Sequence, residues 1–201
     1  MPDIVNFVTC CSRPQFLNEL GKTIYGGEKD KDGHQLFEIR WHIIIDCNKT
    51  NLEDVRANCS YPFIPHEFRD KVSPGAGNMR NMAFRDIKDG WIHVMDDDNI
   101  VHDGFWMIML GLTDLYTRHV LVGDQVMKNG DYRLRGRPEY MRRCAVDSAS
   151  ICWHASLSKG ILWDETSYEC DGIFVEWLAK NHPEKFVFTN VPISYYNWQV
   201  T

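Results

Sequence analysis

The sequence predicts an α/β fold with a mostly parallel central sheet, and two observations carry this prediction. Apolar, β-branched runs typical of buried strands alternate along the chain with segments of helical periodicity, and such alternation places helices between parallel strands. The chain has 201 residues, 44% of them hydrophobic, with no internal repeat, low-complexity tract or linker between domains. We therefore expect a single domain over residues 1–201, large enough to bury one core.

The first expected strand is residues 4–10 (IVNFVTC), a short apolar run. Residues 13–25 follow with apolar side chains at helical spacing, and their proline suits the first turn of a helix. A charged loop with glycines spans residues 26–35, and the second strand, residues 38–48 (EIRWHIIIDCN), comes after it. This order predicts the first parallel pair of the sheet.

A stretch punctuated by prolines around residues 61–65 leads to the next helix, residues 78–89, which we expect to stop at the glycine that follows. Residues 91–95 (WIHVM) are the third expected strand. Residues 104–116 (GFWMIMLGLTDLY) read as a strongly apolar helix, and residues 119–127 (HVLVGDQVM) as a further strand. The alternation of strand and helix thus continues past the middle of the chain.

The second half of the sequence is less regular. Residues 130–143 (GDYRLRGRPEYMRR) are basic, polar and typical of a loop, and residues 144–157 (CAVDSASICWHASL) predict a partly buried strand. Residues 171–186 predict a helix that ends around residues 181–183, where a proline lies. Residues 187–198 (VFTNVPISYYNW) are expected to form the terminal strand, followed by a tail.

Composition excludes several classes of protein. With 28 acidic and 22 basic side chains and a net charge of -6, the chain lacks the basic excess of a non-specific nucleic-acid binder. Its seven cysteines form no C-x-x-C pair, and their odd number predicts reduced thiols in a cytoplasmic protein. We find no signal peptide in the first residues, and no apolar window approaches the roughly 20 residues that a membrane helix needs.

Three adjacent aspartates, Asp96, Asp97 and Asp98, follow the third expected strand. Ligands of open α/β sheets bind at the carboxyl ends of strands, so a site is expected here. Adjacent carboxylates repel one another, and a divalent cation that prefers oxygen ligands, Mg²⁺ or Mn²⁺, offsets their charge together with phosphate oxygens. The alternative is a solvated, aspartate-rich turn that caps the following helix.

Residues 75–106, which contain the run GNMRNMAFRDIKDGWIHVMDDDNIVHDGFW, resemble the nucleotide-sugar-dependent glycosyltransferases of the GT-A fold. The shared features are a helix with an Arg-Asn pair, a short turn, and an apolar strand that runs into a D-x-D motif. The family 2-like bacterial and viral enzymes and the glucuronyltransferases are the most similar, and compact chains of this kind resemble bacterial, phage or large-virus enzymes. The remaining chain resembles them more loosely.

The resemblance implies a Rossmann-like, three-layer α/β/α domain. Residues 1–100 would form the half that binds the nucleotide donor, and residues 101–201 the half that holds the acceptor and the catalytic base. It also implies Asp98 as the principal metal ligand and Asp96 as a second, with Asp97 or Asp96 near the ribose. The metal would bridge the donor diphosphate and neutralise the leaving group.

Further donor contacts are implied at the ends of the first two strands and on the helix. The turn TCCSRP supplies Thr9, Arg13 and, more weakly, Ser12; a plain surface arginine is the alternative for Arg13. Asp46 occupies the place of an acidic residue that accepts a hydrogen bond from uracil, with a helix cap or a turn residue as the alternative. Arg80 in NMRN is expected near the diphosphate or the sugar, where its planar fork suits phosphate oxygens.

An inverting transfer needs a base to take the proton of the acceptor hydroxyl. The run YECDGIFVEWL matches the position of that carboxylate in the family, with Asp171 first and Glu169 second. The alternative for Asp171 is a helix N-cap. Asp147 is a candidate to face the sugars, as are two tryptophans, although core packing is the alternative for Trp153 and Trp163.

The sequence therefore predicts a metal-dependent, inverting glycosyltransferase that moves a sugar from a UDP-linked donor to a hydroxyl of a glycan or other acceptor. A mechanism that retains the anomeric configuration is an alternative. A further domain of a larger protein that supplies the acceptor contacts is another. A Mg²⁺-dependent nucleotidyltransferase is an alternative, although it would show a glycine-rich basic loop where TCCSRP stands. A non-catalytic module that binds nucleotide sugars or glycans is another.

Overall fold

The computed structural model describes residues 3–27, 29, 32–34, 36–112 and 118–199. The strands are β1 (Asp3–Cys11), β2 (Phe37–Asp46), β3 (Ile64–Phe68), β4 (Trp91–Val94), β5 (Ile100–Val101), β6 (Val120–Met127), β7 (Tyr132–Leu134), β8 (Ile151–His154) and β9 (Phe186–Tyr196). The α-helices are α1 (Leu17–Ile24), α2 (Leu52–Asn58), α3 (Gly77–Asp86), α4 (Asp103–Leu112) and α5 (Cys170–Asn181). None of these helices has the length and hydrophobicity needed to cross a bilayer.

One twisted sheet runs through both halves of the described chain, in the order β3-β2-β1-β4-β8-β6-β9-β5, with β7 paired to β6. β1 pairs in parallel with β2 and β4, and β2 with β3. β8 runs antiparallel to β4 and to β6, and so joins this parallel block to the second one, β6 and β9. The predicted α/β fold with a mostly parallel sheet is confirmed.

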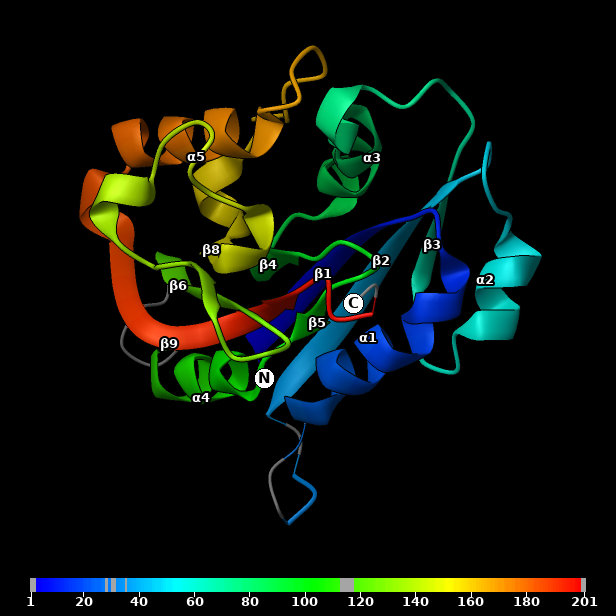
Figure 1. The fold of residues 1–201 in the computed structure, drawn as a ribbon, viewed down its shortest axis with the longest axis horizontal. Coiled ribbons are helices and arrows are strands. Elements are labelled where there is room, and N and C mark those ends of the chain that lie inside the picture. The colour runs from blue at the N-terminus through cyan, green and yellow to red at the C-terminus, as the bar shows by residue number, and fades with distance from the viewer. Residues whose placement is uncertain (1–2, 28, 30–31, 35, 113–117, 200–201) are drawn as a thin grey trace.

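Helices cover both faces of the sheet (Figure 1), and each face has its own core. Alternate residues of a strand point to opposite faces, so a strand buried on both sides needs a continuous apolar run. In β2, Ile43 and Ile45 pack toward α1 and α4, whereas Ile44 packs toward α3 and α5. The runs IVNFV and WHIII, which predicted buried strands, therefore fill two cores at once, and the molecule has three layers.

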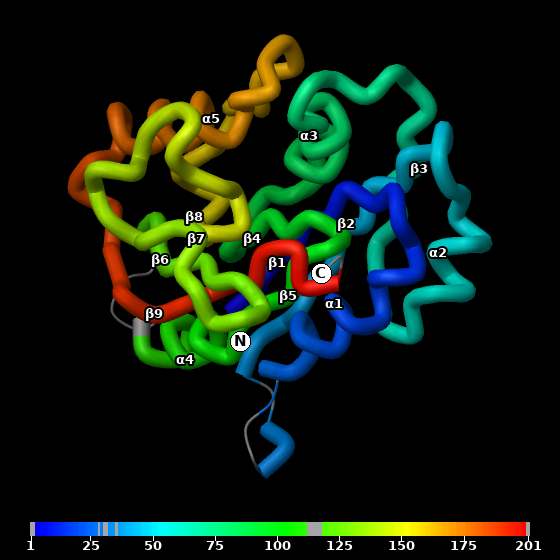
Figure 2. The backbone as a smooth tube through the Cα atoms, viewed as in Figure 1, coloured from blue at the N-terminus to red at the C-terminus, as the bar shows by residue number. Residues whose placement is uncertain are grey.

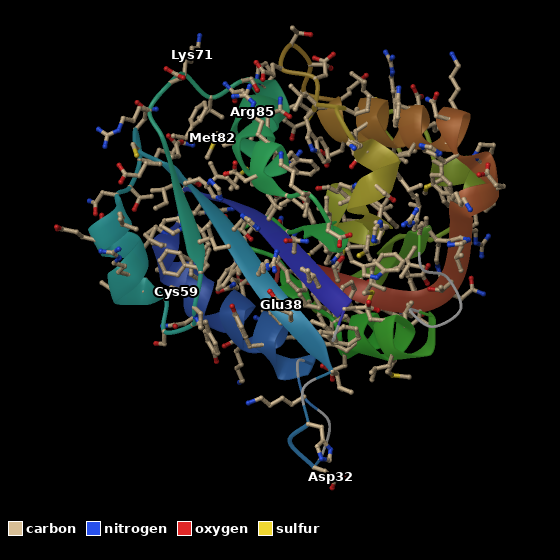
Figure 3. All side chains as sticks on the ribbon, turned by 180° about the vertical axis from the view of Figure 1, so that it is seen from behind. Asp32, Glu38, Cys59, Lys71, Met82 and Arg85 are labelled. Atoms are coloured by element: carbon tan, nitrogen blue, oxygen red, sulfur yellow. The ribbon has the colours of Figure 1, made fainter. Side chains whose placement is uncertain are left out.

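Two elements of the first half differ from the sequence expectation. Helix α2 was not expected; Asn51 caps it by accepting a hydrogen bond from the backbone N of Asp54 at 2.9 Å. The stretch around residues 61–65 also contains the start of β3. Pro65 is compatible with this strand because β3 lies at the edge of the sheet, where the missing N–H costs no ladder bond (Figure 3).

Other boundaries are shorter than expected. Helix α3 ends at Asp86, four residues before Gly90, whose φ of +85° suits the turn into β4. The expected strand over residues 144–157 shrinks to β8, and the two-residue strand β5 is an addition. Residues 113–117 at the end of the expected apolar helix lie outside the described residues. So do residues 28, 30, 31 and 35 of the expected loop and residues 200–201 of the tail.

Buried histidines predict how stability depends on pH. His93 of β4 is fully buried, with Nδ1 2.8 Å from the carbonyl oxygen of Ile151 and its ring stacked on Phe105. Burial lowers the pKa of His93 to about 4. Below about pH 6.5 the imidazole of His93 is therefore protonated in the unfolded chain but stays neutral in the folded chain. The free energy of unfolding falls as the pH drops from 6.5 toward 4.

We expect His93 to cost the folded state about 2 kcal/mol between pH 7 and pH 5, relative to a variant that does not titrate. Urea unfolding of wild type and His93→Gln at both pH values measures this difference. The comparison removes the contribution of Asp96, whose raised pKa acts in the opposite direction. A difference in unfolding free energy that stays constant over this range would contradict the prediction.

Candidate active site

Three parallel strands, β2, β1 and β4, end side by side at one edge of the sheet, and a cavity of about 380 Å³ opens there. Ser12 and Arg13 follow β1, Asp46 ends β2, and the run 96–98 follows β4; all of them line this cavity. We call it the first cavity. It lies where α/β folds bind ligands, at the carboxyl ends of strands.

The middle aspartate fixes the turn after β1. Asp97 is 1% exposed, and its Oδ2 accepts hydrogen bonds from the backbone N of Ser12 at 2.8 Å and of Arg13 at 2.9 Å. Its Oδ1 accepts one from Nε of Arg13 at 2.8 Å. A buried carboxylate with these partners is satisfied, so Asp97 joins the end of β1 to the end of β4.

Arg13 offsets the charge of two aspartates. Its Nη2 pairs with Asp97 and lies 2.9 Å from Oδ2 of Asp98. Burial raises the pKa of Asp98, an effect that Arg13 opposes and the charge of Asp97 strengthens. The guanidinium of Arg13 therefore offsets the negative charge of both Asp97 and Asp98.

Arg80 offsets the charge of the third aspartate from the other side. This buried side chain of α3 pairs through Nη1 with Asp171, has Nη2 3.4 Å from Oδ1 of Asp96, and lies over the ring of Trp163. Burial raises the pKa of Asp96 to about 7 against the opposing charge of Arg80, and the nearby carboxylates of Asp147 and Asp171 add to the rise. Negative charge is thus in excess around Asp96.

A second cavity of about 660 Å³ adjoins the first. Asp96 and Tyr196 line both, and Asp171 and Glu169 line the second. Asp171 lies in the first turn of α5, where its Oδ2 accepts a hydrogen bond from the backbone N of Ser148 at 3.1 Å. The candidate metal ligand and the candidate base therefore face one another across Arg80.

The segment after β9 closes the first cavity, and sequence reasoning missed it. In Figure 2 this segment crosses the middle of the molecule close to β1. The backbone N of Asn197 donates to Oδ1 of Asn99 at 2.8 Å, and Nε2 of Gln199 donates to the carbonyl of Phe16 at 2.9 Å. Tyr196 and Asn197 thereby become wall residues. Tyr196 and Asn197 fall inside the expected terminal strand, residues 187–198, and nothing in that run points to a site.

Solved structures share this architecture. Over 97% of this chain and 60% of that one, residues 1–349 of TarS from S. aureus superpose with a TM-score of 0.67 and 16% identity. The same fragment in complex with UDP-GlcNAc superposes with a TM-score of 0.67 and 18% identity. This match covers 96% of this chain and 58% of that one. The mannosyltransferase PcManGT from Pyrobaculum calidifontis, in complex with GDP-Man and Mn²⁺, gives 0.60 and 14% over 98% and 57%.

This chain has the GT-A fold. It spans less than two thirds of the length of each of these chains, and the low identities carry the fold alone. No family model matches the sequence, and no curated protein matches it either. The predicted Rossmann-like GT-A architecture is thereby confirmed.

Within the GT-A fold, Thr9 does not reach the predicted donor site. It shares a face of β1 with Phe7 and Cys11, which belong to the core under α1 and α4. Its side chain is fully buried, and its hydroxyl accepts a hydrogen bond from Nε1 of Trp41 at 3.0 Å. We therefore leave Thr9 out of the donor-binding residues.

Asp46 does line the first cavity, but its carboxylate is already engaged. Oδ1 accepts hydrogen bonds from the backbone N and the Nδ2 of Asn48 at 3.1 and 3.2 Å, and Oδ2 lies 3.7 Å from Nζ of Lys49. Lys49, which sequence reasoning missed, lines the cavity as well. The end of β2 thus places an acidic and a basic side chain, paired with one another, on the wall of the first cavity.

The second cavity holds the other candidates for sugar contacts. Asp147 lines it and pairs with Arg133 at 2.5 Å. Glu169 lines it and accepts a hydrogen bond from the thiol of Cys144 at 2.7 Å. Trp153 and Trp163 are buried and pack around Phe174, so the core alternative holds for both.

The residues present fit a divalent cation that is shared with a ligand. No cluster of three or more His, Cys, Asp or Glu side chains suited to a metal occurs in the described parts of the chain. Asp96 and Asp98 nevertheless face the same cavity, and burial, with a smaller contribution from the neighbouring carboxylates, raises the pKa of both. Two carboxylates leave coordination positions for phosphate oxygens and water, which is how Mg²⁺ is usually bound.

Proposed function

We propose that this chain is a metal-dependent, inverting glycosyltransferase that moves a sugar from a UDP-linked donor to a hydroxyl of a glycan acceptor. The observation that carries the proposal is the pair of adjoining cavities with Asp96 between them. One offers Arg13, Asp46 and Asp98 to a nucleotide diphosphate, and the other offers Asp171 to an acceptor. Glycosyltransferases with the same fold and with bound UDP-GlcNAc or GDP-Man support it.

In this proposal the first cavity binds the nucleotide. Asp46 faces the base, Ser12 and Arg13 contact the donor from the turn after β1, and Lys49 adds a positive charge on the same wall. Asp98 and Asp96 hold Mn²⁺ or Mg²⁺, which when bound acts as a Lewis acid on the departing diphosphate. Asp97 orients Arg13 and keeps the two strand ends together.

The second cavity binds the sugar and the acceptor. Asp171 accepts the proton of the acceptor hydroxyl while that oxygen attacks the anomeric carbon. Arg80 holds Asp171 and Asp96 in their relative positions, and its guanidinium faces the cavity near the sugar or the diphosphate.

All seven cysteines lie in the described part of the chain as free thiols, which supports a cytoplasmic location.

Calorimetric titration of UDP and of GDP, each with and without Mn²⁺, tests the donor half of the proposal. Wild type is expected to bind UDP in a Mn²⁺-dependent manner, and Asp98→Ala to lose at least about tenfold in that affinity. Asp103→Ala is the matched control, because Asp103 is exposed at the start of α4 and lines neither cavity.

The outcomes separate the parts of the proposal. Equal affinities for UDP and GDP would remove the uracil contact of Asp46 and keep the metal site. Binding of neither nucleotide, with or without Mn²⁺, would overturn the glycosyltransferase assignment. Equal losses in Asp98→Ala and Asp103→Ala would remove Asp98 as a metal ligand.

A further inference from the structure

Tyr168 has a large aromatic side chain, yet this residue is 85% exposed and lies at the rim of the second cavity. It lies three residues before Asp171, the proposed base. Tyrosine rings that are left exposed at binding sites supply a flat apolar face together with a polar hydroxyl, and both suit the rings of sugars.

The loop that carries Tyr168 is held in place by its own hydrogen bonds. Oδ1 of Asp164 accepts from the backbone N of Thr166 at 2.6 Å and of Ser167 at 3.0 Å. Nδ2 of Asn81, on α3, donates to Glu165 at 2.8 Å. The ring is therefore presented from a fixed backbone, and no large ordering cost attends its contact with a ligand.

The same loop is packed closely against the start of α3. Gly75 has a φ of +67°, and a Cβ added there would lie 2.7 Å from the sulfur of Cys170 and 2.9 Å from the carbonyl oxygen of Tyr168. The thiol of Cys170 donates to the carbonyl of Gly75 at 3.2 Å. The rim of the cavity is thus formed by the segment at Gly75 and the loop with Tyr168, which pack tightly against each other.

The charge of the second cavity is unfavourable for an anionic acceptor. Among the described residues, the ionisable groups that line it, cysteine and tyrosine aside, are the guanidinium groups of Arg80 and Arg133 and four carboxylates, those of Asp96, Asp147, Glu169 and Asp171. Both cations are already engaged, Arg80 with Asp171 and Asp96, and Arg133 with Asp147 at 2.5 Å. In the protein without donor and metal, the state that the test below uses, a phosphate or carboxylate on the acceptor would meet like charges, and neither of these two guanidinium groups is free to pair with it.

The basic loop nearby does not change this balance. Arg135 pairs with the buried Asp124 at 3.2 Å, Arg137 lies 3.9 Å from Glu139, and Arg143 pairs with Glu176 at 3.0 Å. None of these arginines lines the cavity, and neither does Arg142. Carboxylates such as Glu169 are instead strong acceptors for the hydroxyl groups of an uncharged sugar.

We infer that the second cavity binds the terminal ring of an uncharged glycan, which stacks on Tyr168 and donates hydroxyl hydrogen bonds to Glu169. The inference rests on the proposed function, since it identifies the acceptor of that reaction, and it excludes acceptors that carry phosphate or uronate at the reacting end. Tyr168 is a binding residue in it, and Asp171 keeps the role of the base.

Saturation-transfer NMR with methyl glycosides and with the matching methyl uronides, which differ only in a carboxylate at C6, tests the inference without a donor. Wild type is expected to bind at least one neutral glycoside about tenfold more tightly than its uronide. Tyr168→Ala is expected to lose about tenfold in that affinity, and Tyr168→Phe to retain it. Tyr132→Ala, which changes an exposed tyrosine outside both cavities, serves as the control.

Three results would overturn the inference. They are uronides that bind as tightly as the neutral glycosides, a Tyr168→Ala variant with unchanged affinity, or no saturation-transfer signal from any neutral glycoside. UDP binding with Mn²⁺ is measured on the same samples. If UDP fails to bind while the neutral glycosides bind through Tyr168, the proposed donor reaction fails and the glycan site stands. If UDP binds and the glycosides do not, only the acceptor inference fails.

Discussion

Asp171→Asn is expected to lower the rate of sugar transfer by about 100-fold to 10,000-fold. The amide retains the shape of the side chain and its place beside the backbone N of Ser148, but it cannot take the proton of the acceptor hydroxyl. UDP affinity in the presence of Mn²⁺ is expected to stay within about threefold of wild type, because Asp171 lines only the second cavity. Release of UDP from the donor, with calorimetry beside it, measures both quantities.

Glu169→Gln is the matched control, since Glu169 is the other carboxylate at the start of α5 in that cavity. Its rate of transfer is expected to stay within about tenfold of wild type, a loss from weaker acceptor contacts alone. A larger loss in Glu169→Gln than in Asp171→Asn would move the base to Glu169. Unchanged transfer in Asp171→Asn would remove the proposed mechanism and favour a non-catalytic module.

Arg80→Met is expected to lower the free energy of unfolding by about 3–5 kcal/mol, because it leaves two carboxylates without their buried cation. The side chain of Arg80 is only 5% exposed, and it pairs with both Asp171 and Asp96. Transfer is expected to be lost as well, since both carboxylates lose the group that holds them in register. Urea unfolding and UDP release report the two effects separately.

Arg85→Met, on the same helix but exposed (Figure 3), is the control and is expected to change the free energy of unfolding by less than about 0.5 kcal/mol. The double variant Arg80→Met with Asp171→Asn is expected to be more stable than Arg80→Met alone, because one unpaired charge is removed. A double variant whose two losses simply add would show that the Arg80–Asp171 pair is not what stabilises this region.

The elements with long apolar runs could be predicted from the sequence, and the short ones could not. β1 and β2 bury both faces, so their runs are continuous and typical of a strand. Helix α2 has seven residues and buries only Val55, which leaves no periodicity to detect; Asn51, Glu53 and Asp54 were the available signal. In β3, Pro65 argues against a strand unless its place at the edge of the sheet is known.

The position of the candidate site followed from the sequence, because the carboxyl ends of parallel strands meet at one edge. The partners of each side chain did not. Asp97 and Asp98 both line the cavity and both pair with Arg13, yet Asp97 also accepts hydrogen bonds from the backbone N of Ser12 and Arg13. The pairing of Arg80 with Asp171 joins residues 91 positions apart, which no local pattern can indicate.

The wall of the first cavity contains Cys10 as well as Asn197, so it joins residues that lie far apart in the sequence. Tyr196 and Asn197 are synthesised long after the turn that follows β1, and contacts between residues so far apart in sequence slow folding. The first cavity, the proposed donor site, is therefore complete only when β9 has joined the sheet. Nucleotide binding should in consequence stabilise the entire chain, rather than its first half, by the free energy of association.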